Sequence, residues 1–333
     1  FFEGYTEKLW GRHPSEISAD WGSQRVKGLS ITALLKDMFK KVFGTKNKGE
    51  VETSLIEQFW YPKYGPGQLW ETAANKVKEL GGKILTGCQV KKIMCEGRKV
   101  TSVVCDTAEG EKTFTGDIFI SSMPVKDLIL GMDGTKPCDT VIKIAKGLPY
   151  RDFVTVGLLV NKLNLKNETN KTTLGNIVPD CWIYVQIFNN WSPYMVEKPE
   201  DTVWIGLEYF CAEGDDFWNM SDEDCVKFAT AELVKMGVIS ENEVLDSHRE
   251  KVKKAYPAYF DTYKHFDTMI KFLDTFPNLY CVGRNGQHRY NNMDHSMLTA
   301  METADAIKTG KKSRKDIWNV NTEKEYHEEK SGN

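Results

Sequence analysis

Residues 279–307 combine an apolar strand pattern, a polar loop with glycine and arginine, and the start of a helix. The apolar run ends at Gly283 and Arg284, and the helix pattern begins near Asn292 to Asp294. The first turn of a helix offers unpartnered backbone N–H groups and carries about half a positive charge. An anion, or a ring that gains negative charge on reduction, is stabilised there. An arginine at the exit of a buried strand can add a fixed charge for a phosphate.

The same pattern has a purely structural interpretation. Asp294 can cap its helix and Arg284 can form a surface ion pair without any ligand. His288 and His295 flank the loop and could relay protons, but no carboxylate is paired with either one in the sequence, which favours ordinary hydrogen bonding. Glu208 interrupts the apolar strand pattern WIGLEYF and lies either at a site or on the solvent side. The residues alone leave these alternatives open.

Composition and charge narrow the class of protein. The 333 residues carry 44 basic and 47 acidic side chains, a net charge of −3, so nucleic-acid binding is set aside. No apolar run approaches the roughly 20 residues that cross a bilayer, and no signal peptide opens the chain, so we expect no transmembrane segment and a cytoplasmic protein. Eight scattered cysteines form no CxxC pair and have no histidine at zinc-ligand spacing, which indicates buried free thiols and no metal site. Nothing in the sequence indicates an oligomeric state.

Two kinds of sheet are predicted around the 279–307 segment. After an amphipathic helix that ends at Gly81, the apolar period changes to two, and a meander of three strands is expected from Lys83 to Met123. FVTVGLLV, CWIYVQIF and TVWIGLEYFC are expected to form a second, antiparallel sheet. Ser221 is expected to cap a helix that ends at Gly237. Two helices have apolar faces: Trp70, Ala73, Val77 and Leu80 on the first, and Met297, Ala300, Met301, Ala304 and Ile307 on the last.

The segment GRNGQHRYNNMDHSM resembles the C-terminal flavin motif of the amine oxidase and protoporphyrinogen oxidase superfamily, close to the branch of UDP-galactopyranose mutase-like proteins. YTEKLWG at 5–11, the stretch from YPKYGPGQLW to QVKKI at 61–93, and KAYPAY at 254–259 are similar to other parts of the same family. The resemblance spans nearly the whole chain, and residues 279–307 are its most specific part.

The resemblance implies FAD as the cofactor. Gly283 and Arg284 would lie along the pyrophosphate and ribityl chain, and the backbone of Val90 would contact adenine. Gly65 and Gly67 would form the turn beside the isoalloxazine. The helix start would lie beneath the pyrimidine edge of the flavin. The residues assigned to FAD are Gly65, Gly67, Val90, Gly283, Arg284, Asn292, Met293 and Asp294.

A small-molecule substrate is expected. The resemblance implies that Arg25 faces the substrate cavity. Tyr61 and Tyr64 belong to an aromatic stretch that either walls a cavity or packs in a core. Arg289 either meets a substrate phosphate or is exposed on its loop. No catalytic side chain is indicated.

The fold class implied is mixed α/β (α+β), the C-terminal part of a two-domain flavoprotein. Residues 68–135 and 278–310 would belong to a discontinuous FAD-binding domain. Residues 1–67 and 140–275 would form a substrate domain with the antiparallel sheet. Residues 311–333 are expected to be a charged C-terminal tail that frays.

One departure from the family pattern concerns the diphosphate. The family opens with a G-x-G-x-x-G turn between a strand and a helix, and no such motif occurs in this sequence, which begins at Phe1. We therefore expect that the βαβ unit carrying this turn lies outside the chain. The chain by itself is expected to be inactive and to bind FAD weakly.

Three functions compete at this point. The leading hypothesis is an FAD-dependent oxidoreductase that takes a hydride from a C–N or C–C bond onto flavin N5. The alternative is an enzyme like UDP-galactopyranose mutase, acting on a nucleotide sugar without net oxidation. The third is a binding or scaffold module that kept the fold and lost the cofactor. Sequence does not choose the substrate, because the shape of the cavity decides it.

Overall fold

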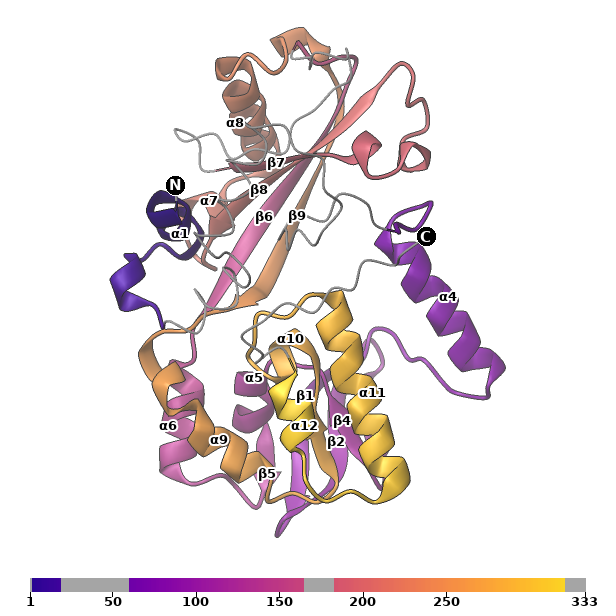
Figure 1. Cartoon of the computed structure of the whole chain (residues 1–333), viewed down its shortest axis with the longest axis vertical. Coiled ribbons are helices and arrows are strands. Elements are labelled where there is room, and N and C mark those ends of the chain that lie inside the picture. The colour runs from indigo at the N-terminus through magenta and orange to yellow at the C-terminus, as the bar shows by residue number, and fades with distance from the viewer. Residues whose placement is uncertain (1, 19–59, 165–182, 321–333) are drawn as a thin grey trace, which may run out of the picture.

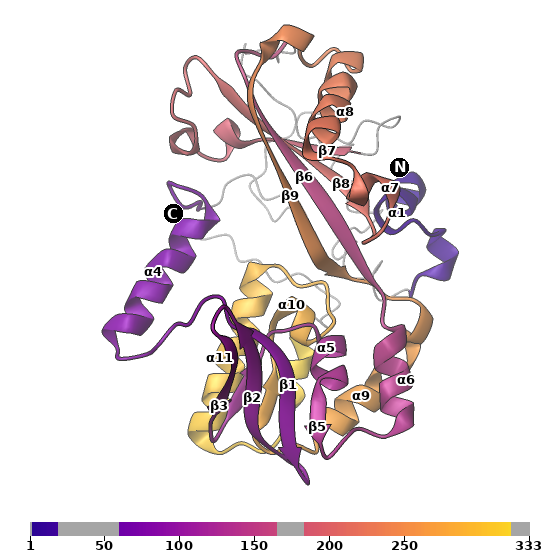
Figure 2. The ribbon, with the colours of Figure 1, turned by 180° about the vertical axis from the view of Figure 1, so that it is seen from behind.

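The computed structural model describes residues 2–18, 60–164 and 183–320, and these form two lobes, each built on its own strands (Figure 1). The long strands β6 and β9 run from the upper lobe down to the lower one (Figures 1 and 2). No helix in the described ranges is both long enough and apolar enough to cross a membrane.

The upper lobe is an antiparallel sheet of strand order β7-β8-β6-β9, with α8 packed on one face. Its strands are β6 Tyr150–Val160, β7 Ile183–Ile187, β8 Val203–Cys211 and β9 Val244–Pro257. Its helices are α1 Phe2–Trp10, α7 Asp216–Asn219 and α8 Asp222–Lys235. Short 3-10 turns are η1 Pro14–Glu16, η2 Phe188–Asn190, η3 Pro193–Met195 and η4 Glu241–Glu243.

Alternating apolar residues build the core of the upper lobe. Every second residue of β6 is buried from Asp152 to Val160, as expected of a strand with one face on a core. The core joins this face to β8 and α8 through Val154, Val156, Leu158, Ile205, Leu207, Ala229 and Leu233. Ser221 caps α8 by accepting a hydrogen bond from the Asp224 amide at 3.0 Å, which confirms the predicted helix start.

The lower lobe combines a mixed sheet of order β3-β2-β1-β5 with a parallel pair, β10-β4. Its strands are β1 Gln89–Glu96, β2 Lys99–Thr107, β3 Gly110–Thr115, β4 Phe119–Ser121, β5 Met132–Gly134 and β10 Leu279–Cys281. Its helices are α5 Val125–Leu130, α6 Asp139–Gly147, α9 Phe266–Leu273, α10 Gly283–Gly286, α11 Met293–Thr309 and α12 Lys315–Asn319, with the turn η5 Asp261–His265. A further helix, α4 Pro66–Glu79, lies beside the lobes and buries none of its residues (Figure 1). The predicted mixed α/β fold class is confirmed at this level.

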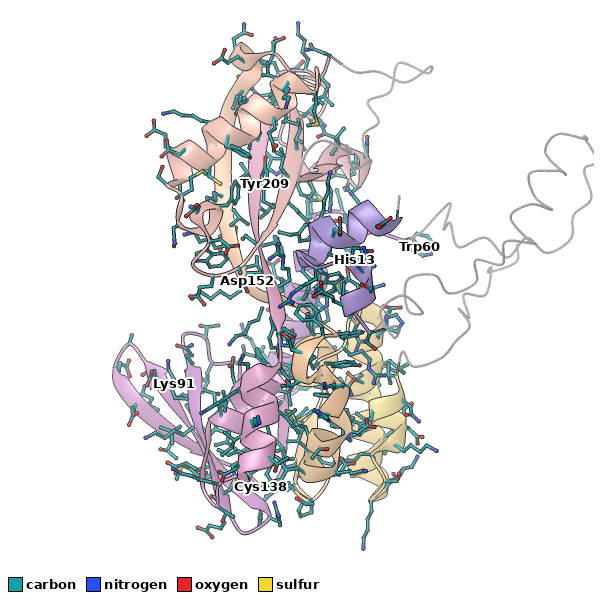
Figure 3. All side chains as sticks on the ribbon, turned by 90° about the vertical axis from the view of Figure 1, so that its left-hand side faces the viewer. His13, Trp60, Lys91, Cys138, Asp152 and Tyr209 are labelled. Atoms are coloured by element: carbon teal, nitrogen blue, oxygen red, sulfur yellow. The ribbon has the colours of Figure 1, made fainter. Side chains whose placement is uncertain are left out.

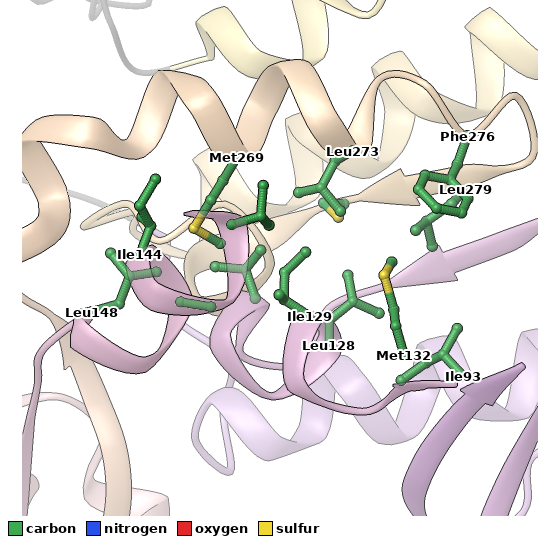
Figure 4. Close-up of a cluster of buried hydrophobic side chains, with 14 of the residues drawn as sticks. Ile93, Leu128, Ile129, Met132, Ile144, Leu148, Met269, Leu273, Phe276 and Leu279 are labelled. Carbon is green, nitrogen blue, oxygen red and sulfur yellow. The ribbon is translucent and has the colours of Figure 1, made fainter. Parts of the chain in front are cut away.

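The core of the lower lobe lies between β1, α5, α6 and α9 (Figure 4). Its members include Ile93, Leu128, Ile129, Met132, Ile144, Leu148, Met269, Leu273, Phe276 and Leu279. The helices α6 and α9 therefore pack in the lower lobe, although the sequence-based division assigns residues 140–275 to the substrate domain. That division stays a prediction.

Three local expectations were wrong. Residues 83–88 are not a strand, and β1 begins at Gln89. The third expected strand is broken at residues 116–118, because its second half, β4, leaves the meander to pair with β10. The expected tail is not frayed throughout: Ile317 and Trp318 of α12 are buried, at 3% and 7% exposure.

Asn278 joins the two groups of strands in the lower lobe. It is 7% exposed; its side-chain oxygen accepts from the Val100 amide at 3.0 Å, and its Nδ2 donates to the carbonyl oxygens of Val100 and Asp117 at 2.7 and 3.0 Å. One side chain thus satisfies three backbone groups at a point where the strands do not pair with one another.

Replacing Asn278 with alanine should lower the free energy of unfolding by about 3 kcal/mol or more, because each buried backbone group left unpaired costs about 1–3 kcal/mol. Asn164→Ala is the matched control, since its side-chain Nδ2 donates to Ser240 Oγ at an exposed site, at 3.3 Å, and its loss should change stability by about 0.5 kcal/mol or less. Urea unfolding of both variants measures the difference. Equal losses would contradict a special role for Asn278.

Candidate functional site

The parallel strands β4 and β10 end side by side, and the loop of interest leaves from that end. Cys281 pairs with Ser121, and the Val282 amide donates to the Ser121 carbonyl at 3.0 Å. The chain then turns into α10 at Gly283. In parallel sheets, ligands bind beyond the carboxyl ends of the strands. The predicted segment therefore lies where the fold is suited to a ligand.

Two glycines let this loop lie close against the strand ends. Gly283 has a φ of +73°, a conformation that side chains other than glycine rarely adopt. A Cβ atom on Gly286 would lie 2.7 Å from the Ser121 carbonyl oxygen. Backbone at these positions is consequently available for close approach.

The helix α11 starts at Met293, with Asn292 as its N-cap residue. The Asn292 amide donates to His295 Nδ1 at 3.3 Å, so His295 closes the first turn from the helix side. Asp294 is not the cap: it lies in the first turn, its side chain is 65% exposed, and its Oδ1 is 3.1 Å from His295 Nδ1. Its charge can act on the helix terminus without closing it.

Arg284 is held in place by neighbours on the protein. Its Nε donates to the Asn291 carbonyl at 2.8 Å and its Nη1 to the Ala255 carbonyl at 3.2 Å. Its guanidinium lies 5.3 and 4.9 Å from the ring centroids of Tyr256 and Tyr290. Among the described residues Arg284 therefore binds backbone carbonyls and lies against two tyrosine rings, and it forms no ion pair there.

One threonine that the sequence-based prediction missed, Thr299, attaches α11 to this loop, while Thr303 donates to the Thr299 carbonyl at 2.8 Å within the helix. Thr299 and Thr303 are fully buried. Thr299 Oγ1 accepts from the Gly283 amide at 2.9 Å and donates to the Ser296 carbonyl at 2.7 Å. The spacing of four residues between the threonines places them on one helix face and was the available signal.

Several buried polar atoms around the strand ends have no hydrogen-bond partner in the described part of the chain. They are Ser121 Oγ, Asn285 Oδ1, Gln287 Oε1 and His288 Nδ1. Leaving such atoms unpaired costs about 1–3 kcal/mol each. Three of them belong to the segments at the end of the parallel pair, since Ser121 ends β4 and Asn285 and Gln287 lie in and next to α10, which fits a site that receives a polar ligand.

His288 is a buried, neutral histidine. Its Nε2 donates to the Ala258 carbonyl at 2.9 Å, and its ring contacts Tyr150 edge-on with centroids 4.8 Å apart. Burial lowers the pKa of His288 to about 4. A proton relay at neutral pH is therefore disfavoured, in agreement with the hydrogen-bonding alternative.

A cavity of about 580 Å³ opens beside the start of β1. Val90 lies on its wall, together with Met123 and Pro124, which follow β4. Asp127 of α5 and Lys254 of β9 line it from the upper side, and their side chains form an ion pair at 2.6 Å. Its remaining lining residues are Gln89, Lys91, Leu130 and Gly131.

The loop before α4 packs on the upper lobe. Ser192 Oγ donates to the Lys63 carbonyl at 2.6 Å, and the rings of Tyr61 and Trp191 lie 5.3 Å apart. Tyr64 meets Tyr194 edge-on at 6.4 Å. These aromatic residues thus join the start of α4 to the turns η2 and η3.

The family model for flavin containing amine oxidoreductases matches residues 36–308. The chain belongs to this family. No curated protein matches its sequence. The predicted resemblance to this group is confirmed.

Two solved structures, a mutase and an oxidase, have a fold similar to that of this chain. Reduced UDP-galactopyranose mutase superposes with a TM-score of 0.75 at 18% identity, over 96% of this chain and 68% of the mutase. Cyclohexylamine oxidase from Brevibacterium oxydans gives a TM-score of 0.51 at 13% identity, over 87% of this chain and 59% of the oxidase. A protein titled putative protoporphyrinogen oxidase from an Exiguobacterium species gives 0.49 at 13% identity, over 72% and 51%. The chain thus spans about half to two thirds of the length of these structures.

The residues predicted to form the site are brought together only in part. Gly283, Arg284 and Asn292 to Asp294 share one loop and helix start. Gly65 precedes α4 with a φ of +84°, and its Cβ position lies 3.4 Å from Met195, whereas Gly67 has open space around it. Arg25 lies outside the described residues.

The side chains of Arg289 and Glu208 each form a hydrogen bond within the protein. Arg289 Nη1 donates to the Val320 carbonyl at 3.2 Å. Glu208 is half-buried on the β8 face opposite the α8 core, where Gln186 Nε2 donates to it at 3.4 Å. Burial raises the pKa of Glu208.

Two helices expose the apolar faces that periodicity identified. α4 buries none of its residues, and Trp70 and Leu80 are 46% and 79% exposed. On α11 the buried residues are Thr299, Thr303 and Ala306, while Met297 and Met301 are 36% and 63% exposed. The apolar residues on these two helix faces are therefore not covered by the described part of the chain.

His288 should make the stability of the chain depend on pH. In the unfolded chain its pKa is near 6.5, and in the folded chain it is about 4. As the pH falls, the unfolded state binds the proton first. The contribution of neutral His288 to the free energy of unfolding is therefore complete above pH 6.5 and declines below it. Between pH 7.5 and pH 5 the loss is about 2 kcal/mol.

The matched variant is His288→Gln, which keeps a donor for the Ala258 carbonyl and does not titrate. Urea unfolding from pH 7.5 to pH 5 should show a steeper loss of stability in the unmodified protein than in the variant. Parallel curves would exclude a buried neutral His288.

Proposed function

We propose that the protein is an FAD-dependent oxidoreductase that oxidises a small molecule. The observation that carries this proposal is the start of α11, beside a glycine-containing loop at the carboxyl ends of β4 and β10, in a chain of the flavin-containing amine oxidoreductase family. The unpartnered polar atoms at these strand ends fit such a cofactor. When bound, FAD would supply a hydride acceptor at N5.

In this proposal the loop and helix hold the cofactor by their backbone. The left-handed turn at Gly283 and the close packing of Gly286 on Ser121 leave main-chain groups beside the diphosphate and ribityl chain. The amides of Met293 and Asp294 would face the pyrimidine edge, where the helix terminus favours negative charge. Asn292 keeps this terminus in place as its N-cap residue.

The other cofactor contacts proposed lie at the cavity and before α4. Val90 lines the cavity and would contact adenine by its backbone. Gly65 and Gly67 would form the turn beside the flavin ring. Arg284 would add its charge near the diphosphate; since two of its nitrogens already bind carbonyl oxygens, it also fixes the loop.

The substrate is proposed to lie between the lobes, against Tyr61 and Tyr64, with Arg25 and Arg289 available for negatively charged groups. The packing of Tyr61 on Trp191 supports this place, because it joins the loop before α4 to the upper sheet.

A second candidate is an isomerase that acts on a nucleotide sugar, like UDP-galactopyranose mutase. Its support is the match to reduced UDP-galactopyranose mutase over 96% of the chain. At 18% identity that match establishes the fold alone. Such a substrate carries a diphosphate, for which Arg25 and Arg289 would be the binding residues.

The diphosphate-binding G-x-G-x-x-G turn is proposed to belong to polypeptide outside these 333 residues. The exposed apolar faces of α4 and α11 support this, because a further unit packed there would cover them.

The two enzymatic functions differ in their response to substrate. With the turn-bearing segment present, an oxidase should lose its flavin absorbance when mixed anaerobically with its amine or other substrate, without added reductant. A mutase should act only after chemical reduction, and UDP should quench its tryptophan fluorescence. Saturable UDP binding would reverse the ranking, and a stoichiometric flavin band from the 333 residues alone would show that no further segment is needed.

Arg284 and Asp294 should differ in what they do for the cofactor. Arg284→Ala should weaken FAD retention by about 1.5–3 kcal/mol, roughly tenfold or more in Kd, because a charge-assisted contact is lost. Asp294→Asn keeps the shape of the side chain and should leave retention nearly unchanged while shifting the flavin reduction potential. FAD occupancy, Tm and potential of both variants are the measurements. Lowered Tm with unchanged occupancy and potential would reduce this loop to a structural element.

A further inference from the structure

The pairing of β9 with β6 is interrupted at one place, between the lobes. Phe153 pairs with Val252 and Arg151 with Tyr256, so residues 253–255 of β9 stand opposite the single residue Asp152. Lys254, inside this bulge, has a φ of +52°. A lysine rarely adopts this left-handed conformation, and such residues persist only where neighbours fix them.

A buried carboxylate fixes the bulge from the β6 side. Asp152 is 8% exposed, and Figure 3 shows it at the base of the upper sheet, next to the lower lobe. Its Oδ1 accepts from the Lys254 amide at 2.5 Å, and its Oδ2 accepts from the Glu213 amide at 2.7 Å. The bulge is therefore held in one conformation by specific hydrogen bonds.

Two groups of the bulge reach the lower lobe. Lys254 Nζ lies 2.6 Å from Asp127 Oδ2 on α5, at the wall of the cavity. The Ala255 carbonyl accepts from Arg284 Nη1 at 3.2 Å. The same bulge thus contacts both α5 and the loop that precedes α11.

Direct contacts continue from Arg284 to the helix start. Its Nε donates to the carbonyl of Asn291, the residue before the N-cap residue Asn292. Beside this connection the rings of Tyr256 and Tyr290 stack at 5.5 Å with an angle of 12°. The position of the Ala255 carbonyl consequently constrains where α11 begins.

We propose that Lys254 is a positioning residue for the first turn of α11. The ion pair with Asp127 anchors the strained bulge on α5, which holds the Ala255 carbonyl within reach of Arg284. Arg284 in turn holds the Asn291 carbonyl and with it the helix start. The significance of this arrangement for flavin chemistry rests on the proposed function, but the mechanical connection does not.

Hydrogen–deuterium exchange of the purified protein tests the connection without any cofactor. Lys254→Ala should raise exchange several-fold at the amides of residues 284–295. In the Lys254→Arg variant, which keeps a positive charge for Asp127, exchange there should equal that of the unmodified protein. Lys253→Ala is the matched control, because Lys253 belongs to the same bulge but pairs with Glu213 of the upper lobe. That control should leave residues 284–295 unchanged.

Increased exchange confined to residues 252–256 and 125–130 would overturn the proposal, and so would an equal effect of Lys253→Ala. If Lys254→Ala does not fold, Lys254→Gly removes the same ion pair while relieving the left-handed strain. It should keep or raise the Tm and still raise exchange at residues 284–295.

Flavin binding gives an independent readout. In flavin-loaded protein, Lys254→Ala should shift the reduction potential and Lys253→Ala should not. If the protein binds no flavin, the proposed function fails, and the exchange experiment still decides the role of Lys254.

Discussion

The candidate site depends on one strand pairing, the parallel pairing of Phe119–Ser121 with Leu279–Cys281. Three residue pairs are a short ladder, and a parallel pair of this size is weak by itself. Asn278 strengthens it from one end by binding Val100 and Asp117, and the Val282 amide extends it at the other by binding the Ser121 carbonyl. The loop with Gly283 and Arg284 leaves from this second end, so any displacement of the pair would move the site.

Local pattern predicted a good part of this arrangement. The alternation in FVTVGLLV gave β6, because one face of a strand meets a core and the other does not. Ser221 before a run of acidic residues predicted the start of α8 for the reason that a side-chain oxygen closes the first turn. The strand, loop and helix at residues 279–309 were also predicted, since glycine, asparagine and apolar spacing all agree there.

What could not be predicted depends on contacts between distant residues. The sequence around Lys254 carries no turn signal. Its left-handed backbone is held by Asp152, about a hundred residues earlier in the chain. For Arg284 the sequence offered a phosphate contact or a surface ion pair, and only the fold shows that it donates to the carbonyls of Ala255 and Asn291. Helix period identified which residues of α4 and α11 share a face. It could not tell that the apolar side would stay exposed, since that depends on what packs there. Ile317 and Trp318 were too few to signal a packed helix within a charged stretch.

The way the lobes are threaded has a consequence for how the chain is made. The lower lobe contains residues that precede the upper sheet in the sequence and residues that follow it. Val100, for example, bonds to Asn278, which comes 178 residues later. During synthesis, β4 therefore emerges long before β10, while β6, β7 and β8 of the upper lobe can already pair with one another. Contacts of such sequence separation form slowly. We infer that β6, β7 and β8 can pair with one another on the ribosome, whereas β4 lacks its partner β10 until the last third of the chain has been translated.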